Sequence, residues 1–363
     1  MRKLKVEGFR FFCVGLVVTL LTACAAPTAT LTPDAFPTDT PFPTLTATTT
    51  LTPIAFPSGT PSPTPEYALH FPAPGLIHDL HWSADGSQLA IAAGTDIHLY
   101  DASLHEQRVI PLGLWTERLA FYPSRPILGA ALKDGSVRFW NSGNGAEICK
   151  FIAHTKGANS LALQPGGSLL ATTGADIISR VWDISSVLTG GCDVKPVAKL
   201  IGSSFTAPDV SFSADGTSFA LVDIKDIYIH NSDTRKLIVV LRGHLAIFDI
   251  ALSPDGHWLA AAQNDSTVTL WDLTAQPKPT STLLHFPQGT STSYTWRVDF
   301  SADASLLAGA TSSGELLVWE LTNLQPIFSR SLGHPISGLA FHPTTSALTV
   351  GTLDGAVYVY SVK

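Results

Sequence analysis

The stretch Ser253 to Asp272 reads SPDGHWLAAAQNDSTVTLWD, and the stretch Leu163 to Asp183 reads LQPGGSLLATTGADIISRVWD. Both contain a turn rich in Pro, Asp or Gly, a strand of small residues, a second turn, and an alternating strand that ends in Trp-Asp. This order of features returns seven times, at a period of about 40–48 residues. A unit this short cannot bury its apolar face alone, so the units must stack on one another.

The seven units share an ending, usually an aromatic residue followed by a polar one. The endings are Tyr100-Asp101, Trp140-Asn141, Trp182-Asp183, His230-Asn231, Trp271-Asp272, Trp319-Glu320 and Tyr360-Ser361. Strands such as Val137–Trp140 alternate, and no stretch after residue 66 has a helical period. The sequence therefore predicts an all-β architecture over residues 66–363.

Two further features identify a family resemblance. Gly-His precedes the first strand at Gly243-His244 and Gly333-His334, with Ala153-His154 in the third unit. An Asp stands six residues before the final aromatic residue at Asp134, Asp176, Asp265 and Asp354. The units resemble WD repeats. The resemblance covers about residues 66–363 and implies a seven-bladed β-propeller of four-stranded antiparallel blades.

The chain ends just after the third strand of unit seven, so the last blade needs a fourth strand from elsewhere. Residues Glu66 to Phe71 read as a strand with no blade of its own. We expect this strand to complete the last blade, closing the ring through both termini and removing two exposed sheet edges.

His, Asp and Ser or Thr recur together in the units, as in a hydrolase triad, but the resemblance to WD repeats implies a structural role for them. It implies a buried hydrogen-bond network within each regular blade, made by His154, Asp176 and Trp182, by His244, Asp265 and Trp271, and by His334 and Asp354. Units one, four and six have altered turns and are expected to lack it. We find no nucleophile elbow, phosphate loop or H-E-x-x-H motif.

The N-terminus has the features of a targeting segment. Basic residues precede an apolar run that is too short for a permanent membrane span, and Leu21-Thr22-Ala23-Cys24 follows. This resembles the lipobox of bacterial lipoproteins, which implies that residues 1–23 are a signal peptide and that Cys24 carries lipid. An ordinary secretory signal with an incidental Cys is the alternative. Residues 24–65 then form a Thr- and Pro-rich disordered linker.

Composition limits the remaining possibilities. The formal net charge is −7, with no basic stripe, which argues against nucleic-acid binding. The dispersed histidines predict no metal site and no cofactor. Outside the signal lie Cys149 and Cys192, the latter in an insertion over residues 187–197. They could form one disulfide in an extracytoplasmic protein or remain two free thiols.

The first strands of a propeller line its central channel. Alignment of the units places several charged residues at equivalent positions there, with aromatic residues nearby and a long loop at Pro287 to Tyr294 in unit six. The possible binding surface comprises Asp79, Trp115, Arg118, Asp209, Phe248, Asp249, Tyr294, Trp296 and Arg297. A channel that holds only ordered water is equally compatible with the sequence. If the surface binds, Trp296→Ala and Arg118→Ala should weaken partner binding without unfolding the domain.

Together these features predict a monomeric, lipid-anchored, extracytoplasmic propeller that binds protein partners or cell-envelope material and is not an enzyme. The alternative is a hydrolase or lyase at the channel mouth, supported only by Asp79, Asp209 and Asp249. The identity of the partner, the membrane and the working face stay open.

Overall fold

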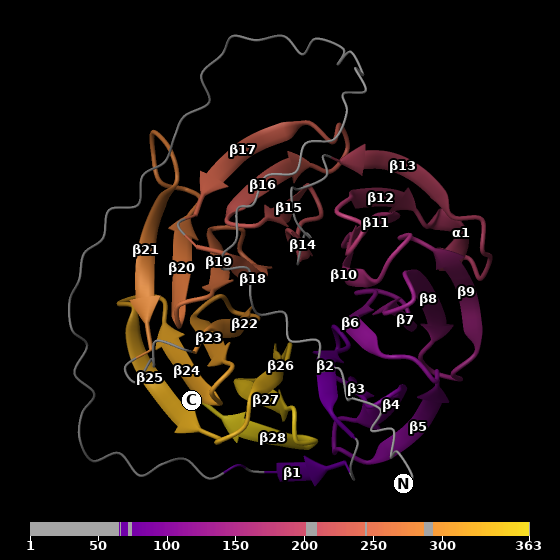
Figure 1. Ribbon diagram of the computed structural model, residues 1–363, viewed down its shortest axis with the longest axis horizontal. Helices are drawn as coiled ribbons and strands as arrows, with labels where there is room; N and C mark the ends of the chain where they lie inside the picture. The colour runs from indigo at the N-terminus through magenta and orange to yellow at the C-terminus, as the bar shows by residue number, and fades with distance from the viewer. Residues whose placement is uncertain are drawn as a thin grey trace, which may run out of the picture. The chain divides into compact units, whose positions relative to one another are not determined.

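The computed structural model describes residue 65 and residues 67–71, 75–200, 209–243, 245–286 and 293–362. In this part of the chain the strands form seven four-stranded antiparallel sheets. The sheets are arranged as blades around a common centre (Figure 1). This arrangement confirms the predicted all-β, seven-bladed propeller.

Each blade has one strand at each of four positions, counted outward from the centre. The innermost strands are β2 (Ile77–Trp82), β6 (Thr116–Phe121), β10 (Ala158–Leu163), β14 (Val210–Phe212), β18 (Ile247–Leu252), β22 (Thr295–Phe300) and β26 (Ile336–Phe341). The second strands are β3 (Gln88–Ala93), β7 (Ile127–Leu132), β11 (Leu169–Gly174), β15 (Ser218–Asp223), β19 (Trp258–Gln263), β23 (Leu306–Thr311) and β27 (Ala347–Thr352). The third strands are β4 (Asp96–Asp101), β8 (Ser136–Asn141), β12 (Ser179–Asp183), β16 (Asp226–Asn231), β20 (Thr267–Asp272), β24 (Glu315–Glu320) and β28 (Ala356–Ser361). The outermost strands are β5 (Glu106–Pro111), β9 (Glu147–Ile152), β13 (Lys195–Leu200), β17 (Leu237–Arg242), β21 (Thr280–His285), β25 (Gln325–Ser331) and β1 (Tyr67–His70).

The turn between the first and second strands is built by its own side chains. In blade five, the Ser253 hydroxyl donates to Asp255 and accepts from the backbone N–H of Trp258 at 2.8 Å. Gly256 has a φ of +73°, a conformation that residues with a Cβ rarely adopt. This local chemistry makes the Ser-x-Asp-Gly pattern a dependable marker of the inner hairpin.

A Trp or Tyr at the end of the third strand packs between blades in every blade except the fourth, which has His230 there. Trp140 of blade two joins a cluster with Ile97 and Leu99 of blade one, and Trp271 of blade five packs with Ile227 and Ile229 of blade four. These large side chains are almost fully buried. The repeated aromatic ending therefore supplies the apolar contact that lets neighbouring units stack.

Strand β1 closes the ring, as predicted. It pairs antiparallel with β28, with Tyr67 opposite Val359 and His70 opposite Ala356. The N–H of Phe71 continues the pairing by donating to Gly355 O at 2.8 Å. One blade thus contains both an early and a late segment of the chain (Figure 1).

The insertion in unit three differs from the expected loop. It contains a single helical turn, α1 (Ser185–Leu188), and ends in the outermost strand β13. Buried Ile184 and Val187 anchor this turn, which is too short to show a helical period in the sequence. No helix in the described ranges is long and apolar enough to cross a membrane.

Candidate functional site

The innermost strands present alternate residues to the channel, which is why the sequence alignment could find them. The first layer of inward residues is Asp79, Arg118, Ser160, Asp209, Asp249, Arg297 and Gly338, and all except Gly338 line a central cavity. At Gly338 a Cβ would lie 2.9 Å from Leu80 Cγ of the next blade, so this position has no room for a side chain.

Arg118 joins the carboxylates of this layer into one ion cluster. Its Nη2 lies 2.9 Å from Asp209 Oδ1 and 2.5 Å from Asp249 Oδ1, and its Nη1 lies 3.8 Å from Asp79 Oδ1. The Arg118 side chain is 15% exposed and the three carboxylates are nearly buried. Four of the charged residues predicted as a binding rim, namely Asp79, Arg118, Asp209 and Asp249, therefore contact one another.

The same carboxylates link neighbouring blades through the backbone. Asp79 accepts from Leu119 N–H at 2.7 Å. Asp209 accepts from Ile250 N–H and Asp249 from Val298 N–H, both at 2.9 Å. Because one Asp supports both the ion cluster and the contact with the next blade, this layer has a structural role, and we no longer expect Arg118→Ala to leave the fold unaffected.

Burial shifts the protonation of the cluster. It raises the pKa of Asp249 to about 7, against the opposing effect of the Arg118 guanidinium and with added repulsion from Asp209. Burial by itself lowers the pKa of Arg118, but Asp209 and the other carboxylates raise it well above its ordinary value. Arg118 therefore stays charged, while Asp249 can take up a proton near neutral pH.

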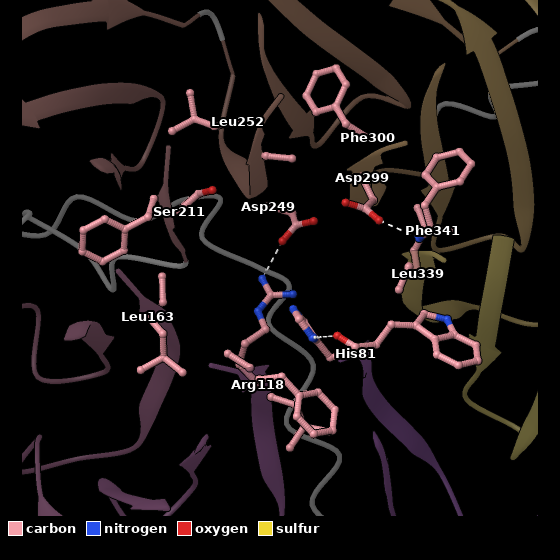
Figure 2. Close-up of a pocket in the computed structure, with 18 of the residues that line it drawn as sticks. His81, Arg118, Leu163, Ser211, Asp249, Leu252, Asp299, Phe300, Leu339 and Phe341 are labelled. Carbon is pink, nitrogen blue, oxygen red and sulfur yellow. Dashed lines mark hydrogen bonds and ion pairs between the residues drawn. The ribbon is translucent and has the colours of Figure 1, made fainter. Parts of the chain in front are cut away.

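A cavity of about 440 Å³ lies on one side of this layer. It extends to the ends of the inner strands, where its rim includes Pro123, Pro165, Pro254 and Pro343 from the first turns. Figure 2 shows side chains of different blades around it, among them His81, Arg118, Asp249 and Asp299. Of these, His81 and Asp299 were not among the predicted site residues.

The spacing of residues in the sequence could have identified both His81 and Asp299. His81 and Asp299 stand two positions after Asp79 and Arg297, so they face the same side of their strands. An alignment that continued two residues past each first-layer position would have found them.

The predicted aromatic residues lie at the other end of the inner strands. Trp115 and Tyr294 directly precede β6 and β22, and Phe248 and Trp296 are second residues of β18 and β22. The rings of Phe248 and Tyr294 are 5.0 Å apart, and those of Tyr294 and Trp296 are 5.6 Å apart. We call Trp115, Phe248, Tyr294 and Trp296 the aromatic rim. None of them lines the cavity, so the charges and aromatics do not share one opening.

Trp115 is the most exposed residue of the aromatic rim, with 49% of its surface accessible. Its ring lies 5.2 Å from that of His78, on the neighbouring blade. Arg297, between the rim and the cavity, donates through Nε to Ser337 O at 2.7 Å. The rim thus offers apolar rings to a partner, while the cation beneath it is held by the backbone.

Blade three has the complete blade network. Trp182 Nε1 donates to Thr172 Oγ1 at 2.9 Å, the same hydroxyl lies 2.9 Å from His154 Nε2, and His154 Nδ1 lies 2.8 Å from Asp176 Oδ1. Arg180 Nη1 also contacts Asp176, 2.9 Å from Oδ2. Burial lowers the pKa of His154. Arg180 Nη1, which can only donate, also lies 2.7 Å from His154 Nδ1, so this ring nitrogen lies between a donor and the Asp176 carboxylate.

The other two predicted networks differ. His334 Nε2 is 3.5 Å from Asp354 Oδ2, but the His334 side chain is 56% exposed. Val350 occupies the strand position that Thr172 has in blade three, so blade seven lacks the central hydroxyl. In blade five, Ala261 is at this position, Asp265 accepts from Thr267 at 2.5 Å and Trp271 is buried. His244 lies outside the described residues.

A disulfide joins Cys149 to Cys192. Cys149 is on β9, the outermost strand of blade two, and Cys192 follows α1 in the insertion of blade three. The bond ties two adjacent blades at their outer edge, close to the insertion that also accepts a hydrogen bond from Arg125 Nη1 at Leu188 O. Cys24 and the proposed signal and linker lie outside the described residues.

The described ranges contain no group of three or more His, Cys, Asp or Glu side chains that could hold a metal ion.

Comparisons with known proteins agree with this architecture. Residues 145–183, 235–272 and 326–361 match the family described as WD domain, G-beta repeat. Each match begins on or just before the outermost strand of one blade and ends with the third strand of the next. This offset explains why β1 must complete the last blade.

The chain is similar in sequence to nuclear distribution protein PAC1 of Arthroderma benhamiae, with 24% identity over 68% of this chain and 56% of the relative. It is also similar to the LST8 homolog of Drosophila melanogaster, with 27% identity over 48% of this chain and 55% of the relative. The chain spans about half the length of these curated relatives.

Among solved structures, the β-propeller domain of Cps50 (Swd1) from Myceliophteria thermophila superimposes with a TM-score of 0.72. The two share 15% identity, and the match covers 83% of this chain and all of that domain. At this identity the likeness concerns the fold alone. Segments of the chain thus match the WD-repeat family, and the fold is that of a seven-bladed β-propeller.

Proposed function

We propose that this chain is a binding module that recognises a protein partner at the aromatic rim and performs no catalysis. The observation that carries the proposal is the set of partly exposed rings at the start of the inner strands, led by Trp115. Exposed aromatic side chains set on a rigid scaffold are favoured anchors in protein interfaces. WD-repeat propellers generally bind protein partners, which supports this assignment.

The contacts of the carboxylates weigh against the alternative of a hydrolase or lyase. Asp79, Asp209 and Asp249 already accept from backbone N–H groups, and the latter two also accept from Arg118. A general base needs an unshared lone pair directed at the substrate. The contacts of these groups hold blades together, which is a structural role that needs no catalysis.

We further propose that the module works outside the cytoplasm on a lipid anchor at Cys24. The sequence Leu21-Thr22-Ala23-Cys24 motivates this anchor, and the Cys149–Cys192 disulfide suits an oxidising compartment. Several acyl chains, each CH₂ contributing about 0.8 kcal/mol, would hold the protein on a membrane. The linker over residues 24–65 would then extend the propeller away from that surface.

The binding proposal is tested with a photo-crosslinking amino acid at position 115, in cells that produce the protein. Position 327 on the outermost strand β25 is the matched control, because Ile327 is similarly exposed at 44%. We expect a discrete crosslinked product from position 115 that Trp296→Ala abolishes without changing the melting temperature. Equal products from both positions, or none from 115, would contradict the proposal.

The anchor is tested separately by Cys24→Ala. We expect this variant to leave the membrane fraction and retain its N-terminal segment in mass spectrometry. A variant that stays in the membrane fraction with a normally processed N-terminus would exclude lipid attachment at this residue.

A further inference from the structure

The cavity of the channel lies on the side opposite the aromatic rim. Its space arises from the second layer of inward residues, in which alanines outnumber all other types: His81, Ala120, Ala162, Ser211, Ala251, Asp299 and Ala340. The four alanine side chains of this layer are too small to fill the channel, which leaves a cavity of about 440 Å³. Leu163, Leu252, Phe300 and Phe341 also line it, so apolar side chains share the walls with the polar groups (Figure 2).

Asp299 is a carboxylate without a counter-cation in the described part of the chain. Its Oδ2 accepts from Phe341 N–H at 2.7 Å, and no ion pair includes it. Burial raises its pKa to about 7; backbone N–H groups of Phe341 and Phe300 oppose this, and Asp249 adds to it. Charge on Asp299 is therefore uncompensated by the protein.

His81 presents a second acceptor to the same cavity. Its Nδ1 lies 2.8 Å from the carbonyl oxygen of Trp82, and a carbonyl can only accept, so Nδ1 carries the proton. In the neutral ring, Nε2 then has a free lone pair. Burial lowers the pKa of His81, which favours this neutral form.

The nearby cations are already engaged. Arg118 pairs with Asp209 and Asp249, and Arg297 donates to the carbonyls of Ser337 and His78. The cavity and its floor thus hold four carboxylates, those of Asp79, Asp209, Asp249 and Asp299, against two guanidinium groups. The net charge of these six groups is negative when Asp249 and Asp299 are both ionised.

We propose that this cavity binds a small organic cation, a primary ammonium or guanidinium group on a short aliphatic body. The cationic end donates to Asp299, which forms no ion pair among the described residues, and Nε2 of His81 is a second acceptor in the wall of the same cavity. The aliphatic body packs against the alanine, leucine and phenylalanine walls. An anion would meet excess negative charge, and a neutral apolar molecule would leave Asp299 without compensation.

The test is calorimetric titration of the purified protein at pH 8 with butylammonium and butylguanidinium. 1-Butanol and butyrate have the same aliphatic body with neutral and negative ends. We expect a dissociation constant on the order of 1 mM for the cations and affinities at least tenfold weaker for the other two. Equal binding of butanol would overturn the proposal. So would the absence of heat from either cation at a concentration about 50 times the expected dissociation constant.

Variants locate the binding. Asp299→Asn keeps an oxygen for Phe341 N–H but loses the charge, so we expect at least a tenfold loss of affinity. Asp193→Asn makes the same change in charge at an exposed insertion residue and should bind normally. Ala251→Leu takes up part of the cavity volume and should also weaken binding. Unchanged affinity in both Asp299→Asn and Ala251→Leu would place the cation elsewhere, and loss of affinity in Asp193→Asn would indicate a general charge effect.

Discussion

The guanidinium of Arg118 in blade two donates to Asp209 and Asp249 in blades four and five, at 2.9 and 2.5 Å. This side chain therefore crosses the channel and joins blade two to blades four and five, neither of which adjoins blade two. Figure 2 shows the pair with Asp249. Each of these carboxylates also accepts from the blade after its own. The ring is thus held both around its circumference and across its centre.

Removal of this cation should destabilise the whole propeller. Arg118→Ala leaves buried carboxylates unpaired, which costs about 3–5 kcal/mol, or a fall in melting temperature of roughly 10 °C. Arg108→Ala removes an exposed charge from β5 and should change the melting temperature little. A melting curve for Arg118→Ala that coincides with the wild type at pH 8 would show that the cluster adds no stability.

The closing strand should be as important as any strand within a unit. A variant that begins at Gly75 lacks β1 and exposes the edge of β28, so we expect a markedly lower melting temperature and self-association through that edge. A variant that begins at Pro65 retains β1 and serves as the control. Identical thermal unfolding and identical size-exclusion profiles would refute a closing role.

The central hydroxyl of the blade-three network can be separated from its neighbour. Thr172→Val leaves the Trp182 N–H and His154 without their shared partner, which costs about 1–3 kcal/mol. Thr173→Val is the matched control, because the buried Thr173 hydroxyl has no hydrogen-bond partner among the described residues. Chemical denaturation should show Thr172→Val destabilised and Thr173→Val unchanged or stabilised; equal effects would contradict the network.

Reduction should weaken the contact between blades two and three. The Cys149–Cys192 bond closes a segment with a sequence separation of 43 residues. In the chain-entropy estimate, such a bond contributes at most about 4 kcal/mol. We expect both thiols to resist alkylation until reductant is added, with a lower melting temperature afterwards. Alkylation of unreduced, folded protein at either residue would disprove the bond.

The stability of Asp299→Asn relative to wild type should depend on pH. In wild type the folded-state pKa of about 7 lies above the ordinary value of 3.8, so folding stability falls as pH rises from about 4 to 7. The Asp299→Asn variant has no carboxyl group at this position, so its stability does not fall for this reason as pH rises. We expect equal melting temperatures near pH 4 and a variant more stable by roughly 5 °C above pH 7.

The comparison between the two proteins at each pH is essential to that experiment. Burial lowers the pKa of His78, His81, His154 and His230, which makes wild-type stability rise with pH up to about 6.5. These histidines are present in both proteins, so their contribution cancels in the difference. A constant difference across the whole pH range would show that Asp299 does not titrate between folded and unfolded states as described.

The site was less predictable than the fold. The alignment of units found Asp79, Arg118 and Asp249 as inward residues but treated them as a free rim, because it contains no information on which side chains meet. It placed the aromatic rim beside them, although alternate strand residues and strand direction put Trp115 at one end of the channel and the cavity at the other. His81 and Asp299 were missed because the alignment stopped at the first layer, two residues before them on the same strands.

By itself the sequence determined the number, order and closure of the blades. Each of those features follows from signals that are local along the chain: Ser-x-Asp-Gly turns, alternating strands, aromatic endings and one unpaired strand before unit one. Only the tertiary structure decided which charges pair. Arg118 finds its partners 91 and 131 residues away, and such contacts depend on the ring bringing every inner strand to one axis. The same convergence buries the carboxylates, shifts their protonation and leaves the cavity whose charge no single repeat could reveal.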